Sequence, residues 1–256
     1  MKKISVFLFI ISVMVCAGCG SDGRQSPLET PAPTCVETPT VQPAPVESPL
    51  GTSPTETPGT APAQRASRIE PFQTICQYPE LPTGCEMTSL TMVLNYNGIP
   101  ADKCDIADNY LDKGEVGTVD FRVAFEGNPR DENSYGCYSP VVVDTANKYL
   151  QAVQSDMRAV DLSGTEFEEL FSYIDAGVPV IVWGTLDCAE GHYSVTWTVN
   201  GTDLTWYTPE HCMVLVGYED KMVWVADPVY GDVRSYDREI FKSRYEVLYR
   251  QAVVIE

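Results

Sequence analysis

A cysteine at the start of a predicted helix is the first residue in this chain that could carry chemistry. The stretch PELPTGCEMTSL, residues 79–90, places Cys85 directly after Gly84, and apolar residues then recur at helical spacing from position 87 to 94. Backbone N–H groups at a helix N-terminus are unpaired and carry partial positive charge, which lowers the pKa of a thiol there. The alternative is a small buried thiol, the usual state of a free cysteine.

A nucleophilic cysteine needs a base to take its proton and return it to the leaving group. The chain contains two histidines. His211 opens HCMVLVGY at the head of a predicted apolar strand, whereas His192 lies in AEGHYS and is interpreted as a loop histidine. We therefore expect His211 to be the base.

Two further groups would complete such a site. Asp227, at the end of the strand VWVAD, is the candidate to orient the imidazole, with Asp220 and Asp232 as alternatives. If the two strands pair as a hairpin, His211 and Asp227 lie at one sheet edge, and Cys212 points to the opposite face as a packing residue. The oxyanion formed on attack needs hydrogen-bond donors, which the Cys85 backbone N–H and the Gln77 amide could supply.

The segments QYPELPTGCEMTSLTMVLNYNGI, EHCMVLVGYED, ADPVYG and QAVVI together resemble the C39-like cysteine peptidases, relatives of bacteriocin-leader peptidases within the papain-like clan. The resemblance spans positions 73–256. It implies a papain-like fold, Cys85 as nucleophile, His211 as general base and acid, Asp227 as orienting residue and Gln77 in the oxyanion hole. Gln73 is the alternative for the last role, because upstream loops vary in length.

Periodicity predicts helices first and strands afterwards. Ser139 with Pro140 at the first helical position, and a Thr165-x-x-Glu168 capping box, mark two helix starts. Asn200-Gly201 predicts a hairpin turn. The predicted helices cover 84–98, 102–111, 139–153 and 165–177, and the predicted strands cover 178–185, 193–208 as a hairpin, 211–220, 222–228 and 251–256. This order indicates an α+β domain with N-terminal helices packed on an antiparallel sheet.

The N-terminus is typical of an exported lipoprotein. MKKISVFLFIISVMVCAGC has two lysines, an apolar run too short to span a bilayer, and small residues before Cys19, which resembles a lipobox. We expect a signal peptide at 1–18, lipidation of Cys19, a Pro/Thr-rich disordered stalk at 19–67, and a folded domain at 68–256. The predicted location is the outer face of a bacterial cell membrane, with membrane contact through the lipid anchor only.

The composition limits which classes of partner are expected. The formal net charge of −19 repels phosphate backbones, so nucleic acid is not an expected partner. Outside Cys16, Cys19 and Cys85, six cysteines remain, with 15 possible pairings in an oxidising compartment and no zinc-site spacing. No metal and no cofactor are expected, and the protein is predicted to be a monomer.

The predicted function is hydrolysis of peptide bonds in a peptide or protein substrate, with isopeptide or cell-wall cross-links as an alternative substrate. A surface binding module that kept the fold without catalysis is the competing class. Glu86 is interpreted as a first-turn acid favoured by the helix dipole and not as a reactant. The four tryptophans, Trp183, Trp197, Trp206 and Trp224, are expected in the core rather than on a substrate platform.

Overall fold

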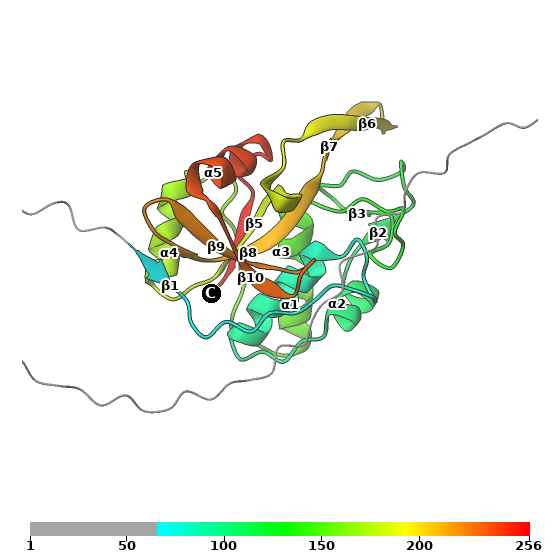
Figure 1. Cartoon of the computed structure of the whole chain (residues 1–256). Coiled ribbons are helices and arrows are strands. Elements are labelled where there is room, and N and C mark those ends of the chain that lie inside the picture. The colour runs from blue at the N-terminus through cyan, green and yellow to red at the C-terminus, as the bar shows by residue number, and fades with distance from the viewer. Residues whose placement is uncertain (1–65) are drawn as a thin grey trace, which may run out of the picture. The chain divides into compact units, whose positions relative to one another are not determined.

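The structure is a computed structural model and describes residues 66–256. The three long N-terminal helices precede the main strands, as expected for an α+β domain, and one further helix, α5, lies between the last strands (Figure 1). The helices are α1 (Cys85–Tyr96), α2 (Lys103–Asn109), α3 (Ser139–Ala152), the short α4 (Phe171–Asp175) and α5 (Arg238–Val247), with single 3₁₀ turns at Phe167–Leu170 and Leu186–Cys188.

One antiparallel sheet forms the centre of the domain, with the strand order β10-β9-β8-β5-β11-β4 and β1 added beside β8. Its central strand β5 is buried along its whole length, which explains its continuous apolar sequence. The strands of this sheet are β1 (Ser67–Arg68), β4 (Ala159–Asp161), β5 (Val180–Thr185), β8 (Glu210–Tyr218), β9 (Met222–Asp227), β10 (Asp232–Asp237) and β11 (Ala252–Ile255).

Two small sheets lie beside the central one. The strands β2 (Lys113–Gly114) and β3 (Phe125–Glu126) form a short parallel pair. The strands β6 (His192–Val199) and β7 (Thr202–Thr208) form the predicted hairpin, which extends away from the central sheet in Figure 1. Asn200 and Gly201 both have positive φ, at 51° and 79°, as the predicted tight turn requires.

Two helix starts differ from the prediction. Helix α3 has Tyr138 as its N-cap, and the Ser139 hydroxyl bonds the Ser163 hydroxyl at 2.8 Å instead of capping the helix. The Thr165-x-x-Glu168 capping box does not form, because Thr165 Oγ1 donates to the Leu162 carbonyl oxygen at 2.5 Å and Glu168 pairs with Lys242. Ser139 and Glu168 therefore bond distant residues instead of capping a helix, whereas Thr165 bonds a carbonyl oxygen in its own turn.

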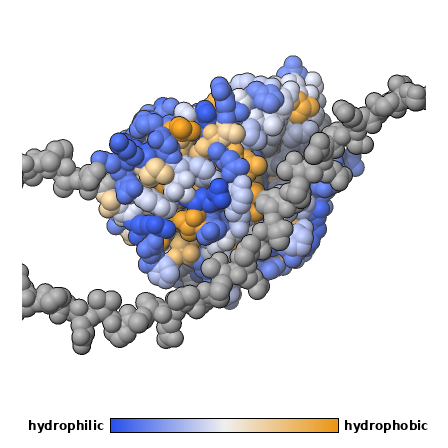
Figure 2. Space-filling model, in the orientation of Figure 1, coloured by the Kyte–Doolittle hydropathy of each residue, from blue (hydrophilic) through white to orange (hydrophobic). Residues whose placement is uncertain are grey.

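The β1 strand pairs with β8 through Ser67, so the folded part begins within the segment predicted as stalk. Within residues 66–256, no helix combines the length and apolar character needed to span a membrane. On the face shown in Figure 2, hydrophobic residues form small groups among hydrophilic ones, an ordinary mixture for a protein surface.

Candidate active site

A tight loop precedes Cys85, which is the first residue of α1. The Leu81 N–H donates to the Gln77 carbonyl oxygen, and the Gly84 N–H donates to the Leu81 carbonyl oxygen, both at 3.0 Å. A Cβ atom on Gly84 would lie 2.6 Å from the Leu81 Cβ, so only glycine fits this turn without rearrangement. Gly84 is the N-cap and supplies no side chain to the helix end. The first N–H groups of α1 therefore remain available to a ligand.

Helix α1 packs against β8, which carries the predicted base. The Ser89 hydroxyl donates to the Cys212 carbonyl oxygen at 3.2 Å and fixes the second turn of the helix on this strand. One turn earlier, the backbone of Cys212 lies close enough to the Cys85 thiol to lower its pKa, although burial outweighs this effect. Two segments separated by more than 120 positions thus place Cys85 beside the residue that follows His211.

His211 and Asp227 form a buried pair. His211 Nε2 lies 2.8 Å from Asp227 Oδ1, and the two side chains are 3% and 0% exposed. Strands β8 and β9 are antiparallel and pair Val214 with Ala226, so alternation puts both side chains on one face of the sheet. This confirms the predicted placement of the two residues on neighbouring strands.

Asp227 is held as an acceptor. Its Oδ1 also accepts the Val229 N–H at 2.9 Å, and the Tyr236 hydroxyl lies 3.5 Å from Oδ2. Burial raises the pKa of Asp227, but the charge of His211 and the hydrogen bonds from His211 and Val229 outweigh it, so the pKa lies below the usual range. An ionised Asp227 fixes the imidazole by Nε2 and leaves Nδ1 as the nitrogen available for proton transfer.

Gln77 is buried beside this pair, whereas the alternative Gln73 is exposed. The Gln77 backbone N–H donates to the Pro228 carbonyl oxygen at 2.7 Å, which ties the loop before Cys85 to the turn after Asp227. One N–H of the Gln77 side-chain amide donates to the Pro82 carbonyl oxygen at 2.8 Å. Because the amide carries two N–H groups, one remains to serve as an oxyanion donor.

The Cys85 thiol differs from the expectation for a helix N-terminus. It donates to Glu86 Oε2 at 3.4 Å, and no hydrogen bond joins it to His211 within residues 66–256. Burial, together with the nearby Glu86 and Glu210 carboxyls, raises the pKa of Cys85 well above its ordinary value. The expected lowering by the helix terminus is therefore wrong for this state, because desolvation and adjacent acids exceed the effect of the dipole.

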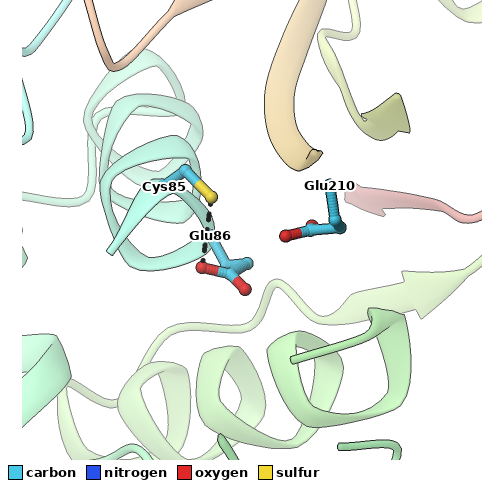
Figure 3. Close-up of side chains that lie close together, drawn as sticks. All are labelled: Cys85, Glu86 and Glu210. Carbon is cyan, nitrogen blue, oxygen red and sulfur yellow. Dashed lines mark hydrogen bonds between the residues drawn. The ribbon is translucent and has the colours of Figure 1, made fainter. Parts of the chain in front are cut away.

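Sequence reasoning missed the Glu86–Glu210 pair. Figure 3 shows the Glu210 carboxylate pointing toward Cys85 and Glu86, and one oxygen of each acid lies within 4.8 Å of the other and of Cys85 Sγ. Glu86 occupies the first turn of α1, as predicted, but it is fully buried and bonds the thiol instead of facing solvent. The sequence did contain a signal for this pair, because each acid is the direct neighbour of a predicted catalytic residue. Glu86 follows Cys85 in GCE, and Glu210 precedes His211 in EHC.

A cavity of about 670 Å³ lies outside this cluster, and neither Cys85, Glu86, Glu210 nor His211 belongs to its wall. Tyr138 belongs to its wall and is close enough to Glu210 to be affected by its charge. The cavity combines aromatic rings with polar groups, and two buried polar atoms in it, Tyr138 Oη and Gln251 Nε2, have no hydrogen-bond partner. Its wall includes Phe121, Tyr193, Tyr249, Ser163, Asp161 and Asp203.

The other residues considered in the sequence analysis differ from one another in burial. His192 is exposed and begins β6, so it lies in a strand rather than a loop. The alternative acids Asp220 and Asp232 are exposed, whereas Asp227 is buried. Cys212 is fully buried, as expected for a packing residue. Trp183 and Trp206 are core residues, while Trp197 and Trp224 are half-buried.

The cysteines divide into two groups. Cys76, beside Gln77, is disulfide-bonded. Five thiols in the described part are free, and four of them are buried; these five are Cys85, Cys104, Cys137, Cys188 and Cys212. The predicted lipidation residue Cys19 lies outside the described residues.

Comparison with known proteins agrees with this architecture. A crystal structure from Bacillus anthracis assigned as a C39-like peptidase superposes with a TM-score of 0.68 at 32% identity, covering 75% of this chain and 98% of that one. Helices packed on an antiparallel sheet in this arrangement define the papain-like fold of C39-like peptidases. The uncharacterized protein YvpB of Bacillus subtilis (strain 168) is 31% identical over 189 residues, covering 70% of this chain and 71% of YvpB. The Peptidase_C39 like family model matches residues 69–253, so the chain belongs to the Peptidase_C39 like family.

Proposed function

We propose that this protein is a cysteine peptidase that hydrolyses peptide or isopeptide bonds through Cys85, His211 and Asp227. The observation that carries the proposal is the buried His211–Asp227 pair, whose 2.8 Å contact uses Nε2 and leaves Nδ1 of the imidazole for proton transfer. A base fixed by a carboxylate and a cysteine at a helix N-terminus together make an activated nucleophile.

The proposed reaction transfers the acyl group of the substrate first to the Cys85 sulfur and then to water. The Cys85 thiol turns from Glu86 toward His211, gives its proton to Nδ1 and attacks the substrate carbonyl as a thiolate. The negative charge that develops on the carbonyl oxygen is met by the Cys85 backbone N–H and the free N–H of Gln77. His211 then protonates the leaving amine, and water activated by the same imidazole releases the acyl group from sulfur.

The cavity that Tyr138 lines is the proposed subsite for a substrate side chain. Its aromatic walls can bury apolar surface, and the unpartnered Tyr138 Oη and Gln251 Nε2 can bond a polar group. The proposed substrate is a peptide or protein, and the acidic surface does not favour nucleic acid. Anchoring to the outer face of the cell membrane through a lipid on Cys19, and a monomeric state, are further parts of this proposal.

The test is hydrolysis of fluorescently labelled casein by the protein, with Cys85→Ala as the key variant. We expect Cys85→Ala to abolish hydrolysis, because no other group in the described site can form the acyl intermediate. Cys104→Ala is the matched control, since Cys104 is a free thiol on α2 and should leave the rate unchanged. Equal rates for Cys85→Ala and the unaltered protein would overturn the proposal.

The raised pKa of Cys85 is the one observation that favours the competing function, a binding module without catalysis. The two functions differ in the reactivity of the thiol. A nucleophile paired with His211 reacts with iodoacetamide at pH 6 in stoichiometric amount, whereas an ordinary buried thiol does not. Mapping the modified residue by mass spectrometry decides between them.

A further inference from the structure

Two acids lie beside Cys85, the fully buried Glu86 and the half-buried Glu210. Within residues 66–256, neither Glu86 nor Glu210 forms an ion pair with a lysine, arginine or histidine. A Cβ atom on Gly136 would lie 2.4 Å from Glu86 Oε1 and 3.4 Å from Glu210 Oε2, so both carboxyls converge over this glycine. Two carboxyls this close in a buried site are not both ionised, because like charges repel and desolvation penalises each of them.

The hydrogen bonds indicate which acid holds the proton. Both oxygens of Glu86 accept, Oε1 from the Cys137 N–H at 2.6 Å and Oε2 from the Cys85 thiol at 3.4 Å. Glu210 Oε1 is buried and has no partner. Burial raises the pKa of Glu86 to about 7, and burial with the charge of Glu86 raises that of Glu210 well above its usual range. Glu210 is therefore the protonated member, and Glu86 is the member that titrates near neutrality.

Several other groups face this thiol. Helix α1 contributes Glu86, strand β8 contributes Glu210, His211 and Cys212, the segment before α3 contributes Cys137, and the loop before α1 contributes Tyr78. Burial raises the pKa of Cys137 and of Cys212 well above the ordinary value, so both stay neutral. The pKa of Tyr78 is also raised. Glu86 is thus the acid whose charge changes beside Cys85 near neutrality.

We propose that Glu86 is a positioning residue for Cys85: its protonated carboxyl donates a hydrogen bond to the thiolate, and its ionised carboxyl holds the thiol proton. This inference rests on the proposed function, because only a nucleophilic Cys85 gives the position of that proton a role.

The two states differ by one proton. In the reactive state Cys85 is a thiolate, His211 Nδ1 carries the former thiol proton, and Glu86 Oε2 carries a proton of its own. On the alkaline side Glu86 releases its proton to solvent, the proton on His211 returns to sulfur, and the thiol donates to Glu86 Oε2. Both states keep the contact between Cys85 Sγ and Glu86 Oε2, which is 3.4 Å in the structure. Glu210 stays protonated and neutral in both states, so it adds no second negative charge beside the sulfur.

The test is the rate of Cys85 alkylation by iodoacetamide between pH 5 and 9, in the presence of a chelator, with the Cys85 peptide quantified by mass spectrometry. An ordinary thiol reacts faster as pH rises, because its thiolate fraction grows. We expect the opposite for Cys85, a rate about tenfold lower at pH 8 than at pH 6, the factor that one pKa unit gives. The free and half-buried Cys104 in the same sample is the reference thiol for alkylation.

Three variants test which residue causes the fall in the rate of Cys85 alkylation above pH 7. Glu86→Gln keeps an acceptor for the Cys137 N–H and a permanent donor for sulfur, so the fall above pH 7 should disappear. Glu210→Gln places a neutral amide where the structure has a protonated carboxyl, and should keep the fall. Glu219→Gln, an exposed acid just beyond the other end of β8, is the charge control and should match the unaltered protein.

The outcomes separate the two proposals. A fall that persists in Glu86→Gln, or that is lost only in Glu210→Gln, overturns the inference. If Glu86→Gln does not fold, as judged by circular dichroism, the unaltered protein still decides, since a rate that rises steadily with pH contradicts the inference while leaving Cys85 a nucleophile. If Cys85 in the unaltered protein is not labelled at any pH, the proposed function itself fails.

Discussion

At the residue scale, the orientation of one imidazole organises the site. His211 uses Nε2 for Asp227, which leaves Nδ1 as the nitrogen for the proposed proton transfer with Cys85. The Gln77 side chain is also fixed by one hydrogen bond. One N–H of its amide donates to the Pro82 carbonyl oxygen, and the other N–H is free. Both side chains are nearly inaccessible to solvent, so their geometry does not depend on an exposed and mobile rotamer.

Asp227→Asn should reduce kcat on labelled casein by roughly 10²–10⁴-fold, because an amide does not stabilise the imidazolium and can bond the wrong tautomer. Asp232→Asn is the matched control, since Asp232 is exposed, and its kcat should stay within about twofold of the unaltered protein. An equal loss in both variants would argue against Asp227 as the orienting residue. The measurement is steady-state kinetics with the folded state checked by circular dichroism.

Gln77→Ala should lower kcat by about 10²–10³-fold with little change in KM, because an oxyanion donor acts in the transition state and not on the bound substrate. Gln73→Ala provides the comparison, as Gln73 is exposed in the same loop. If Gln77→Ala raises KM and leaves kcat unchanged, Gln77 binds substrate instead of stabilising the oxyanion.

At the element scale, the site depends on a helix and a loop meeting one strand. The start of α1, the segment before α3 and the start of β8 converge at Cys85, Glu86 and Glu210. Gly136 makes this approach possible, since a side chain there would lie 3.1 Å from the Trp206 ring as well as against both acids. A close approach of this kind requires glycine because there is no room for a Cβ atom.

Gly136→Ala should therefore destabilise the protein by about 1–3 kcal/mol, the usual cost of overpacking a filled interior. Gly98→Ala is a useful comparison, because nothing lies within 4 Å of its Cβ position and its cost comes only from a φ of 75°. Urea unfolding followed by fluorescence measures both. A negligible loss for Gly136→Ala would show that the acids can move apart at little cost.

At the scale of the whole molecule, the buried acids link stability to pH. Glu86 has a pKa near 7 in the folded protein and an ordinary value near 4.5 when unfolded. Between these values the folded state binds more protons than the unfolded state, so its contribution to stability is present at low pH and is lost as pH rises toward 7. Asp227 contributes in the opposite direction, because its pKa is lowered and its stabilisation is lost in acid.

Glu86→Gln should remove the first of these effects. Relative to the variant, the unaltered protein should lose on the order of 3 kcal/mol of unfolding free energy between pH 4.5 and pH 7.5, the value of a shift of about two and a half pKa units. Urea unfolding of both proteins across this pH range gives the difference directly. A difference that does not vary with pH would mean that Glu86 has an ordinary pKa in the folded state.

Much of the fold and most of the site residues could be predicted from local pattern. The helix after Gly84, the buried strand β5 and the Asn200-Gly201 hairpin depend on periodicity and turn chemistry, which neighbouring residues carry in full. Two helix caps were predicted wrongly because Ser139 and Glu168 bond distant residues, Ser163 and Lys242. A cap is a single hydrogen bond, and a tertiary contact of similar strength can replace it.

The sequence by itself determined the types of the reacting groups and the elements that carry them: Cys85 at a helix start, His211 and Asp227 on successive strands, and an amide upstream. Only the tertiary structure decided the ionisation of those groups. The pKa of Cys85 depends on burial and on Glu86 and Glu210, which come from α1 and β8 and meet only when the helix packs on the sheet. Chemical type is a property of each residue, whereas the dielectric and charge around it belong to the assembled fold.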